Sequence, residues 1–366
     1  MPLLPTHALL ANDPAKQACY GFKRKSVSDS HIDFSIPLSY NDILNSPPTD
    51  IEEKARWALV KKNIHSCVDQ GHYSPHSNAY FAYEIGSNSS NIGVIGCISD
   101  KDLKIKIVEH EATHTHRVNA FTSYLETVGL QAEPCVIAFK YTIEWQEIEV
   151  IIRKLKPYRS FEIQGVPHRI WLIEQNQYDV FNRIHMFFRQ SDKPYVLIDG
   201  HHRKQAIHHF NREIYSTDLL SYCLPHTAIK SKSFVWSSQK ITPGMVDWIQ
   251  NVAEIVESAP KQLTKSPIVL FRVYGKWYKL KTQQLQETLL VTDSKLKHEK
   301  IKINKHPQIE SIQDIDQKNP NTPLLIFFTP ISAYQLLHWS KEKLCLPAKT
   351  TYMEPKILTG LFLQLM

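Results

Sequence analysis

The sequence is poor in glycine, and its cysteines are few and scattered. Among 366 residues there are 11 Gly, 21 Pro and 6 Cys, a composition that excludes a collagen-like chain and a low-complexity coil. No two cysteines form a CxxC pair, so the sequence indicates neither a zinc knuckle nor a disulfide framework. Several lie in apolar runs, where a reduced cysteine packs as a small hydrophobic residue. We therefore expect a reduced, cytoplasmic protein.

Long hydrophobic runs are also absent from the sequence. No stretch approaches the roughly 18 uncharged apolar residues that a membrane-spanning helix needs, so we expect no membrane partner. Residues 1–11 carry no basic region ahead of their short apolar run, which argues against a secretory signal. The net charge of +7 is mild for this length, and the sequence contains no dense basic tract. It favours anionic ligands such as phosphates and gives no reason to expect nucleic acid.

Apolar residues make up 42% of the chain, enough for a sizeable core. Strand and helix patterns alternate, which predicts a mixed α/β (α+β) fold rather than a sandwich or a bundle. The predicted strands are 79–85, 92–98, 103–108, 134–141, 194–198 and 324–328, with hairpins at 163–173 and 268–281. The predicted helices are one that starts at 49–50, then 115–128, 143–155, 177–188, one that follows Arg203, then 245–257 and 331–343.

Domain boundaries are weakly marked, because no clean linker is present. Residues 1–48 are rich in Pro, Ser and Asn and read as irregular. We divide the chain into an N-terminal extension with a helix and hairpin (1–90), a core (91–235) and a C-terminal α/β portion that packs on the core (236–366).

The most informative segment is the run Asp199, Gly200, His201, His202 and Arg203. It follows a short apolar strand and opens a helix. Free backbone N–H groups at a helix start attract anions, and a glycine lets a phosphate approach the backbone. The histidines and the arginine add donors, and the aspartate can hold Mg²⁺ or orient a hydroxyl. The alternative, in which Asp199 only caps the helix and the histidines are solvated, stays open.

A second segment reads His110-Glu111-Ala112-Thr113-His114, a literal HExxH string. Such a string binds zinc when both histidines lie on one helix, with His116 as a candidate third ligand. Here the preceding residues alternate like a strand, and the threonines are typical of a helix start, so we favour Glu111 alone as a general base at a strand end. It can instead cap the next helix or pair with Arg117.

A third segment lies near the C-terminus and contains Lys349, Thr350, Thr351, Tyr352 and Lys356. Proline residues make it a loop rather than a helix. Lysines, hydroxyls and an aromatic ring in a loop suit phosphate oxygens and ring stacking. The residues alone favour the plainer alternative, an ordinary solvated tail, although the apolar run after it predicts that the chain end is anchored in the protein body.

Together these three motifs resemble a known family. The order HE-x-T at 110–113, DGHHR at 199–203 and P-x-KTTY-x-x-PK at 347–356 is similar to that of the uncharacterised conserved family called domain of unknown function ten-fifteen. The likeness runs from about residue 51 to the end, and the family usually has serine where this chain has Thr350. The His-Glu and DG-x-HR pairing also resembles free serine kinases of the ParB/sulfiredoxin superfamily.

The resemblance implies a ParB/sulfiredoxin-like catalytic core over 91–235, flanked by N- and C-terminal additions. It implies ATP or ADP with Mg²⁺, and Glu111 as the base that deprotonates a hydroxyl. Asp199 would belong to the catalytic and metal-binding part of the phosphate loop. By this resemblance, Gly200, His201, His202 and Arg203 are expected at the nucleotide phosphates. Nothing catalytic is carried over to the C-terminal motif, and we expect only that Lys349, Thr350, Thr351 and Lys356 lie near the nucleotide phosphates.

Three functions follow as alternatives. The first is a nucleotide-dependent kinase of a small hydroxyl compound, with free L-serine as the leading candidate. The second is a non-catalytic, ParB-like regulator that binds a nucleotide, and the third is a zinc hydrolase using His110 and His114. Sulfiredoxin-like reduction ranks last, because the 199–203 loop contains no cysteine. We expect a nucleotide and a small molecule as partners and leave a homodimer open.

Overall fold

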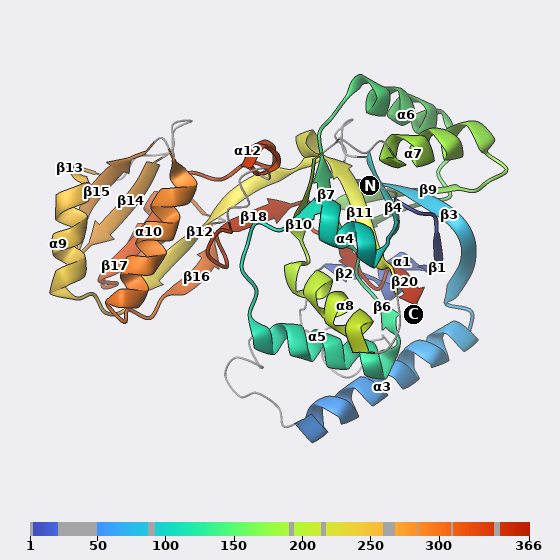
Figure 1. Cartoon of the computed structure of the whole chain (residues 1–366), viewed down its shortest axis with the longest axis horizontal. Helices are drawn as coiled ribbons and strands as arrows, with labels where there is room; N and C mark the ends of the chain where they lie inside the picture. Colours follow the sequence, from blue (N-terminus) through green and yellow to red (C-terminus); the bar gives the residue numbers. More distant parts are fainter. Residues whose placement is uncertain are drawn as a thin grey trace. The chain divides into compact units, whose positions relative to one another are not determined.

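The computed structural model groups the chain into two compact units. The first unit comprises Met1–Glu109, Thr113–Ile229 and Pro355–Met366, and the second comprises His110–Ala112 and Lys230–Glu354. Each unit is described by itself (Figure 1). The residues that the structure describes are 3–20, 50–86, 92–189, 194–213, 217–258, 268–282, 284–308, 310–339 and 345–366.

The first unit is built on an eleven-stranded mixed sheet. Along the sheet the strands run β5-β10-β7-β11-β4-β3-β1-β20-β6, with β9 also paired to β3 and β8 paired to β9. Two neighbouring pairs, β5 with β10 and β7 with β11, are parallel. Its strands are β1 (Thr6–Ala11), β3 (Tyr73–Ile85), β4 (Ile92–Ile98), β5 (Ile107–Val108), β6 (Leu130–Gln131), β7 (Cys135–Phe139), β8 (Arg159–Ile163), β9 (Val166–Ile173), β10 (Tyr195–Asp199), β11 (Leu219–Pro225) and β20 (Phe362–Leu365).

Helices of the first unit pack in two groups, which Figure 1 shows at different ends of the labelled sheet strands. In one group, Trp57 of α3 meets Tyr124 of α5 edge-on at 5.4 Å, and α5 also packs on α8. In the other, Trp145 of α6 and Phe187 of α7 enclose Phe139 of β7. The helices are α1 (Pro14–Gln17), α3 (Asp50–Asp69), α4 (Asp100–Lys106), α5 (Thr115–Val128), α6 (Ile143–Lys154), α7 (Tyr178–Arg189) and α8 (His201–Glu213), and a small sheet joins β2 (Cys19–Tyr20) to β19 (Leu358–Thr359).

The second unit has a seven-stranded sheet of its own. Its order is β13-β15-β14-β17-β12-β16, and β18 pairs with β12. All of its strand pairs are antiparallel. The strands are β12 (Lys230–Ser238), β13 (Glu254–Val256), β14 (Ile268–Val273), β15 (Lys276–Lys281), β16 (Asn304–Pro307), β17 (Leu324–Phe328) and β18 (Thr351–Glu354), and the helices are α9 (Pro243–Val252), α10 (Leu285–His298), α11 (Ile312–Lys318) and α12 (Ala333–Trp339).

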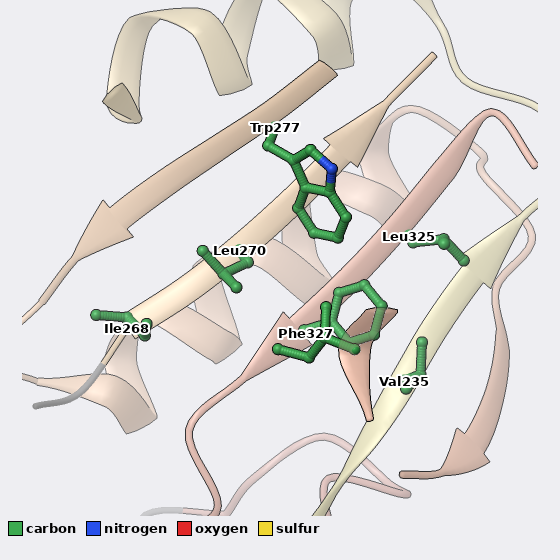
Figure 2. Close-up of a cluster of buried hydrophobic side chains, with 7 residues drawn as sticks. Val235, Ile268, Leu270, Trp277, Leu325 and Phe327 are labelled. Atoms are coloured by element: carbon green, nitrogen blue, oxygen red, sulfur yellow. The ribbon is translucent and has the colours of Figure 1, made fainter. Parts of the chain in front are cut away.

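Alternation along these strands divides the core of the second unit into two faces. Alternate side chains of β12, β14, β15 and β17 gather in one cluster, and its labelled members lie over the same face of the sheet in Figure 2. Ile312, the first residue of α11, joins this cluster. On the other face of the sheet, Phe271 of β14 contacts Trp248 of α9, with the ring centres 5.9 Å apart. The cluster consists of Val235, Ile268, Leu270, Trp277, Ile312, Leu325 and Phe327.

The predicted mixed α/β fold is confirmed. Helix α5 has the predicted bounds and ends at Gly129, which has a left-handed φ of 75°. The hairpin of β14 and β15 likewise has its predicted bounds of 268 and 281 and turns at Gly275. The strand predicted at 194–198 forms as β10, and the helix predicted after Arg203 forms as α8.

One predicted strand is wrong. Residues 103–108 alternate in hydrophobicity, but Asp100–Lys106 forms α4 and only Ile107–Val108 is extended. The Ser99 hydroxyl accepts a hydrogen bond from the Asp102 backbone N–H at 3.3 Å, so a helix cap overrides the alternation. The predicted helix 245–257 is also too long, because α9 ends at Val252 and β13 follows it.

Other expectations lie partly outside the described residues. These are residues 21–48 of the segment predicted to be irregular and the end of the helix predicted at 331–343, of which α12 is the described part. In residues 3–20 the prediction of irregular structure is wrong, because β1, α1 and β2 form there and β1 pairs with β3 and β20. Within the described residues, no helix combines the length and the apolar character needed to cross a membrane. The division at 90 and 235 stays a prediction, although the compact units run across these boundaries because β1, β3 and β20 share one sheet with β7 and β10.

Candidate functional site

The 199–203 loop joins β10 to α8 in the first unit. The Gly200 carbonyl accepts the first helical hydrogen bond, from the Lys204 N–H at 2.9 Å, so Gly200 and not Asp199 occupies the N-cap position. Gly200 has φ +96°, and a Cβ there would lie 2.5 Å from the Cys135 sulfur. Only glycine suits this turn. The loop therefore presents the open end of a 13-residue helix, the end that attracts anions.

Arg203 is held by protein acceptors on the side of the loop that faces the interior. Its Nη1 donates to the carbonyls of Glu133 at 3.0 Å and Pro134 at 2.8 Å, and its Nη2 donates to Asp199 Oδ2 at 2.9 Å. It also pairs with the Glu133 carboxylate at 2.8 Å, and its side chain is only 15% exposed. These contacts make Arg203 the group that fixes the loop, whereas its predicted role as a phosphate ligand stays untested.

Asp199 and Lys356 form the more exposed part of this site. Lys356 Nζ donates to Asp199 Oδ1 at 3.2 Å, and both side chains are about one-third exposed. The lysine, predicted to lie near the nucleotide, thus lies beside the loop. Since Asp199 Oδ2 accepts from Arg203, both carboxylate oxygens face cations. Each carboxylate oxygen keeps a second lone pair for a further ligand, so the expected magnesium ligation by Asp199 stays a prediction.

Glu133, two residues before β7, is a member of the site that sequence reasoning missed. Its carboxylate pairs with Arg203 and accepts a hydrogen bond from the Thr359 hydroxyl at 2.9 Å. Burial raises the pKa of Glu133, while Arg203 opposes that rise. Buried carboxylates with raised pKa values are frequent at functional sites. Nothing in the sequence marks this residue, because its partners lie 70 and 226 positions away along the chain.

Cys135 of β7 also lies beside the loop. Its thiol donates to the Gly200 carbonyl at 3.4 Å, so a cysteine is present where the loop sequence shows none. Burial raises the pKa of Cys135 to about 12. A thiol with this pKa is not a thiolate at neutral pH, so the new neighbour does not favour sulfiredoxin-like reduction.

The two histidines of the loop are not simply solvated. His201 is buried, with 8% of its surface exposed. His202 Nε2 accepts a hydrogen bond from the His114 backbone N–H at 3.0 Å, and the two rings stack at 5.9 Å. His202 therefore connects the start of α8 to the start of α5.

A partly open cavity adjoins the loop, between α5 and α8. Its lining is mainly apolar. Glu133 and Arg203 form its polar end, and Tyr124 supplies an aromatic wall. An apolar cavity with a few convergent polar groups is the usual form of a small-molecule site.

Glu111 belongs to the second unit, where its carboxylate is surrounded by donors. Oε1 accepts from the backbone N–H groups of Thr350 at 3.2 Å and Thr351 at 2.7 Å, and from the Thr351 hydroxyl at 2.5 Å. Oε2 accepts from the Lys349 N–H at 3.3 Å. The alternative in which Glu111 caps the next helix is wrong, since α5 is capped by His114 and no side-chain bond supports that cap.

The HExxH string is not helical. Glu111 forms a parallel β-bridge with Leu346, and the Leu346 N–H donates to the His110 carbonyl at 2.7 Å. His110 and His114 consequently do not lie one helical turn apart, the geometry that a zincin requires. Among the described residues, no group of three His, Cys, Asp or Glu side chains could hold a metal ion.

The C-terminal loop at 349–351 is well anchored. Thr350 is buried, and its hydroxyl donates to the Pro347 carbonyl at 2.5 Å. Lys305 Nζ donates to the Ala348 carbonyl at 2.8 Å, and Trp236 Nε1 donates to the Lys349 carbonyl at 3.2 Å. The solvated-tail alternative is therefore wrong, while the predicted anchoring of the chain end is seen in β19 and β20.

Two groups of predicted residues thus emerge, one within each unit. In the first unit, Asp199, Arg203 and Lys356 are brought together. In the second, Glu111 meets the loop at Lys349–Thr351.

A family model described as "Protein of unknown function (DUF1015)" matches residues 31–222, more than half of the chain. The chain belongs to this family. The matched region contains Glu111 and the 199–203 loop and ends before the C-terminal motif. No curated protein matches this chain.

Among solved structures, this DUF1015 member is similar to SbnI with a C-terminal truncation from Staphylococcus aureus, at 11% identity over 72% of this chain and 85% of that chain, with a TM-score of 0.44. It is similar to a free serine kinase in complex with AMP, at 13% identity over 71% and 87% and a TM-score of 0.40. It is also similar to a conserved hypothetical protein from Pyrococcus furiosus, at 12% identity over 72% and 92% and a TM-score of 0.39.

Proposed function

We propose that this protein is a nucleotide-dependent kinase that phosphorylates the hydroxyl of a small molecule, with free L-serine as the first candidate. The observation that carries the proposal is the 199–203 loop, where Gly200 at φ +96° opens α8 beside Lys356. A helix start and a nearby lysine are the parts from which proteins build phosphate sites. The motif resemblance to ParB/sulfiredoxin-superfamily serine kinases adds to this proposal.

Each residue receives a separate role. The first N–H groups of α8 and the Lys356 ammonium bind phosphate oxygens, and Arg203 keeps Asp199 and the loop in place. Glu111 accepts the proton of the acceptor hydroxyl while that oxygen bonds to the terminal phosphorus and the bond to the leaving nucleotide oxygen breaks. ATP or ADP with Mg²⁺ is the donor in this proposal, and Asp199 is the residue expected to hold the ion.

A regulator that binds the nucleotide without turnover is the second candidate. One observation favours it: the Glu111 carboxylate already accepts four hydrogen bonds. Donors that stabilise a carboxylate make it a weaker base. A kinase must release some of these bonds before Glu111 can take a proton, whereas a regulator need not.

The test is phosphorus NMR of the full chain with Mg²⁺, ATP or ADP, and a panel of hydroxyl compounds that includes L-serine. We expect a new phosphomonoester signal with the wild type and its loss in Glu111→Gln, which keeps the shape of the side chain. Removing a general base lowers rates about 10²- to 10⁴-fold. The matched control is Glu354→Gln, which removes a carboxylate paired with Lys232 in the same unit and should retain turnover.

The outcomes separate the candidates. Nucleotide shifts without any phosphomonoester would support the regulator and contradict the kinase. An equal loss of turnover in both glutamine variants would show that the second unit is damaged and that Glu111 has no special role. The absence of any nucleotide interaction would overturn both candidates.

A further inference from the structure

The donors around Glu111 form a preassembled oxyanion site. Three successive backbone N–H groups, those of Lys349, Thr350 and Thr351, converge on one carboxylate together with the Thr351 hydroxyl. Lys349 has a left-handed φ of 59°, which is uncommon for a residue with a side chain. Successive N–H groups around a left-handed residue make a concave anion-binding nest.

The nest is rigidly supported from behind. The Lys349 carbonyl accepts a hydrogen bond from Trp236, and the Ala348 carbonyl accepts one from Lys305. The Thr350 hydroxyl donates to the Pro347 carbonyl. The groups that point into the nest are therefore fixed by bonds that do not involve Glu111. Because Lys349, Thr351 and Glu111 are all partly exposed, a solvent ion can reach the place that the carboxylate fills.

The described donors around Glu111 converge mainly on one of its oxygens. Among the described residues, Oε1 accepts three of these hydrogen bonds and Oε2 accepts one, at 3.3 Å. A carboxylate oxygen offers about two lone-pair sites, so the donors exceed what Oε1 can use. A phosphoryl group has three oxygens and more charge, and it can share four donors more evenly.

Positive charge near the nest is also in place. Burial lowers the pKa of Lys305, whereas Asp293, which pairs with the lysine at 3.4 Å, and then Glu111 raise it. The Lys305 ammonium lies 3.8 Å from the centre of the Trp236 ring. A second negative charge in the nest would favour the charged form of Lys305 still more.

We infer that the 349–351 nest binds a phosphoryl group and that Glu111 fills it when no ligand is bound. Entry of the phosphoryl group displaces the carboxylate, which frees Glu111 to accept a proton. The base is thereby switched on only when a phosphorylated ligand is present. The identification of the ligand as a phosphoryl group rests on the proposed function, whereas the exchange itself can be tested without turnover.

The test measures binding of inorganic phosphate to the full chain by calorimetry. Glu111→Ala empties the nest, so its phosphate dissociation constant should fall about tenfold or more, because a self-ligand present nine-tenths of the time weakens apparent binding by that factor. Adding Thr351→Val, which deletes one donor together with its contact to His110 Nε2 at 2.9 Å and keeps the backbone N–H, should reverse part of the gain. Glu354→Ala is the control and should bind phosphate as the wild type does.

The inference is overturned if Glu111→Ala binds phosphate no better than the wild type. The choice of ligand is overturned if Glu111→Ala increases the affinity for acetate as much as the affinity for phosphate, which would indicate a carboxylate site. If Glu111→Ala does not fold, threonine-selective ¹⁵N labelling of the wild type decides: the Thr350 and Thr351 amide signals must move with phosphate, and unmoved signals contradict the exchange. Tighter phosphate binding by Glu111→Ala, together with no turnover by the wild type, would support the nest as a phosphate site and contradict the kinase proposal.

Discussion

Arg203 ties the 199–203 loop to the segment before β7, through the carbonyls of Glu133 and Pro134. As part of a DGHHR motif it reads as a phosphate ligand, because a guanidinium suits paired oxygens. In the fold it instead connects β7, β10 and α8 through Glu133, Pro134 and Asp199. Anions outweigh the effect of burial and raise the pKa of Arg203, so it stays charged. The residue more available for phosphate is Lys356, which lies at the edge of the same cluster.

This difference predicts opposite behaviour for two alanine variants. Arg203→Ala should lose on the order of 3–5 kcal/mol of unfolding free energy, because it leaves the Glu133 carboxylate buried without its cation. Lys356→Ala, at a side chain 35% exposed, should lose less than about 1 kcal/mol but weaken nucleotide binding about tenfold, since a charged hydrogen bond contributes about 1.5 kcal/mol. Urea unfolding and nucleotide titration measure the two effects.

The stability loss of Arg203→Ala should also depend on pH. Burial raises the folded-state pKa of Glu133, and removing Arg203 removes a cation that lowers it. A carboxyl with a raised pKa in the folded state binds more protons there than in the unfolded chain, so stability falls as pH rises through that interval. The variant should therefore be closer to the wild type at pH 5 than at pH 8. A loss that is equal at both pH values would contradict this account of Glu133.

At the scale of elements, local signals predicted well wherever a cap or a turn residue agreed with the hydrophobic pattern. Gly129 and Gly275 marked the end of α5 and the turn between β14 and β15 correctly. The pattern misled at 103–108, because the Ser99 cap starts a helix there in spite of the alternation. Helix α10 was not predicted at all, because the lysines near its end obscure the helical spacing of the buried Leu289 and Leu296 in the sequence.

The 199–203 loop was the easiest part of the site to predict, because strand, glycine and helix follow one another within a few residues. The contact between Glu111 and Thr351 was not predictable, since the two residues are 240 positions apart along the chain and meet beside the β-bridge to Leu346. Contacts of this kind depend on topology, and neither period nor spacing encodes them.

The tight approach of Gly200 gives a prediction for the β10–α8 connection. Gly200→Ala should be more destabilising than Gly165→Ala, although both glycines have positive φ, because only at Gly200 does a Cβ meet another atom. The left-handed conformation alone should cost about 1–2 kcal/mol. The excess at Gly200 comes from the Cys135 sulfur at 2.5 Å, so Cys135→Ala should recover part of it in a double-mutant cycle measured by urea unfolding. Purely additive effects would show that backbone strain, and not the sulfur, sets the cost.

At the scale of the whole molecule, the chain builds each unit from distant segments. Strand β20, near the C-terminus, pairs with both β1 and β6, so the last residues complete the sheet of the first unit. The short piece His110–Ala112 joins the second unit although the first unit flanks it on both sides. Each unit has its own buried aromatic residues, with Phe362 in the first and Phe327 in the second.

Separate cores predict that damage stays within one unit. Phe362 packs against Phe81 at 5.2 Å, Phe327 packs against Trp277 at 5.8 Å, and both phenylalanines are fully buried. Each substitution to alanine should cost about 3–5 kcal/mol through the cavity that it leaves. Hydrogen exchange should show Phe362→Ala lowering amide protection in β3 and β4 while β14 and β17 keep theirs, and Phe327→Ala doing the reverse. If either variant lowers protection equally in both sheets, the units unfold as one cooperative body, and binding at the 199–203 loop would then stabilise the 349–351 nest as well.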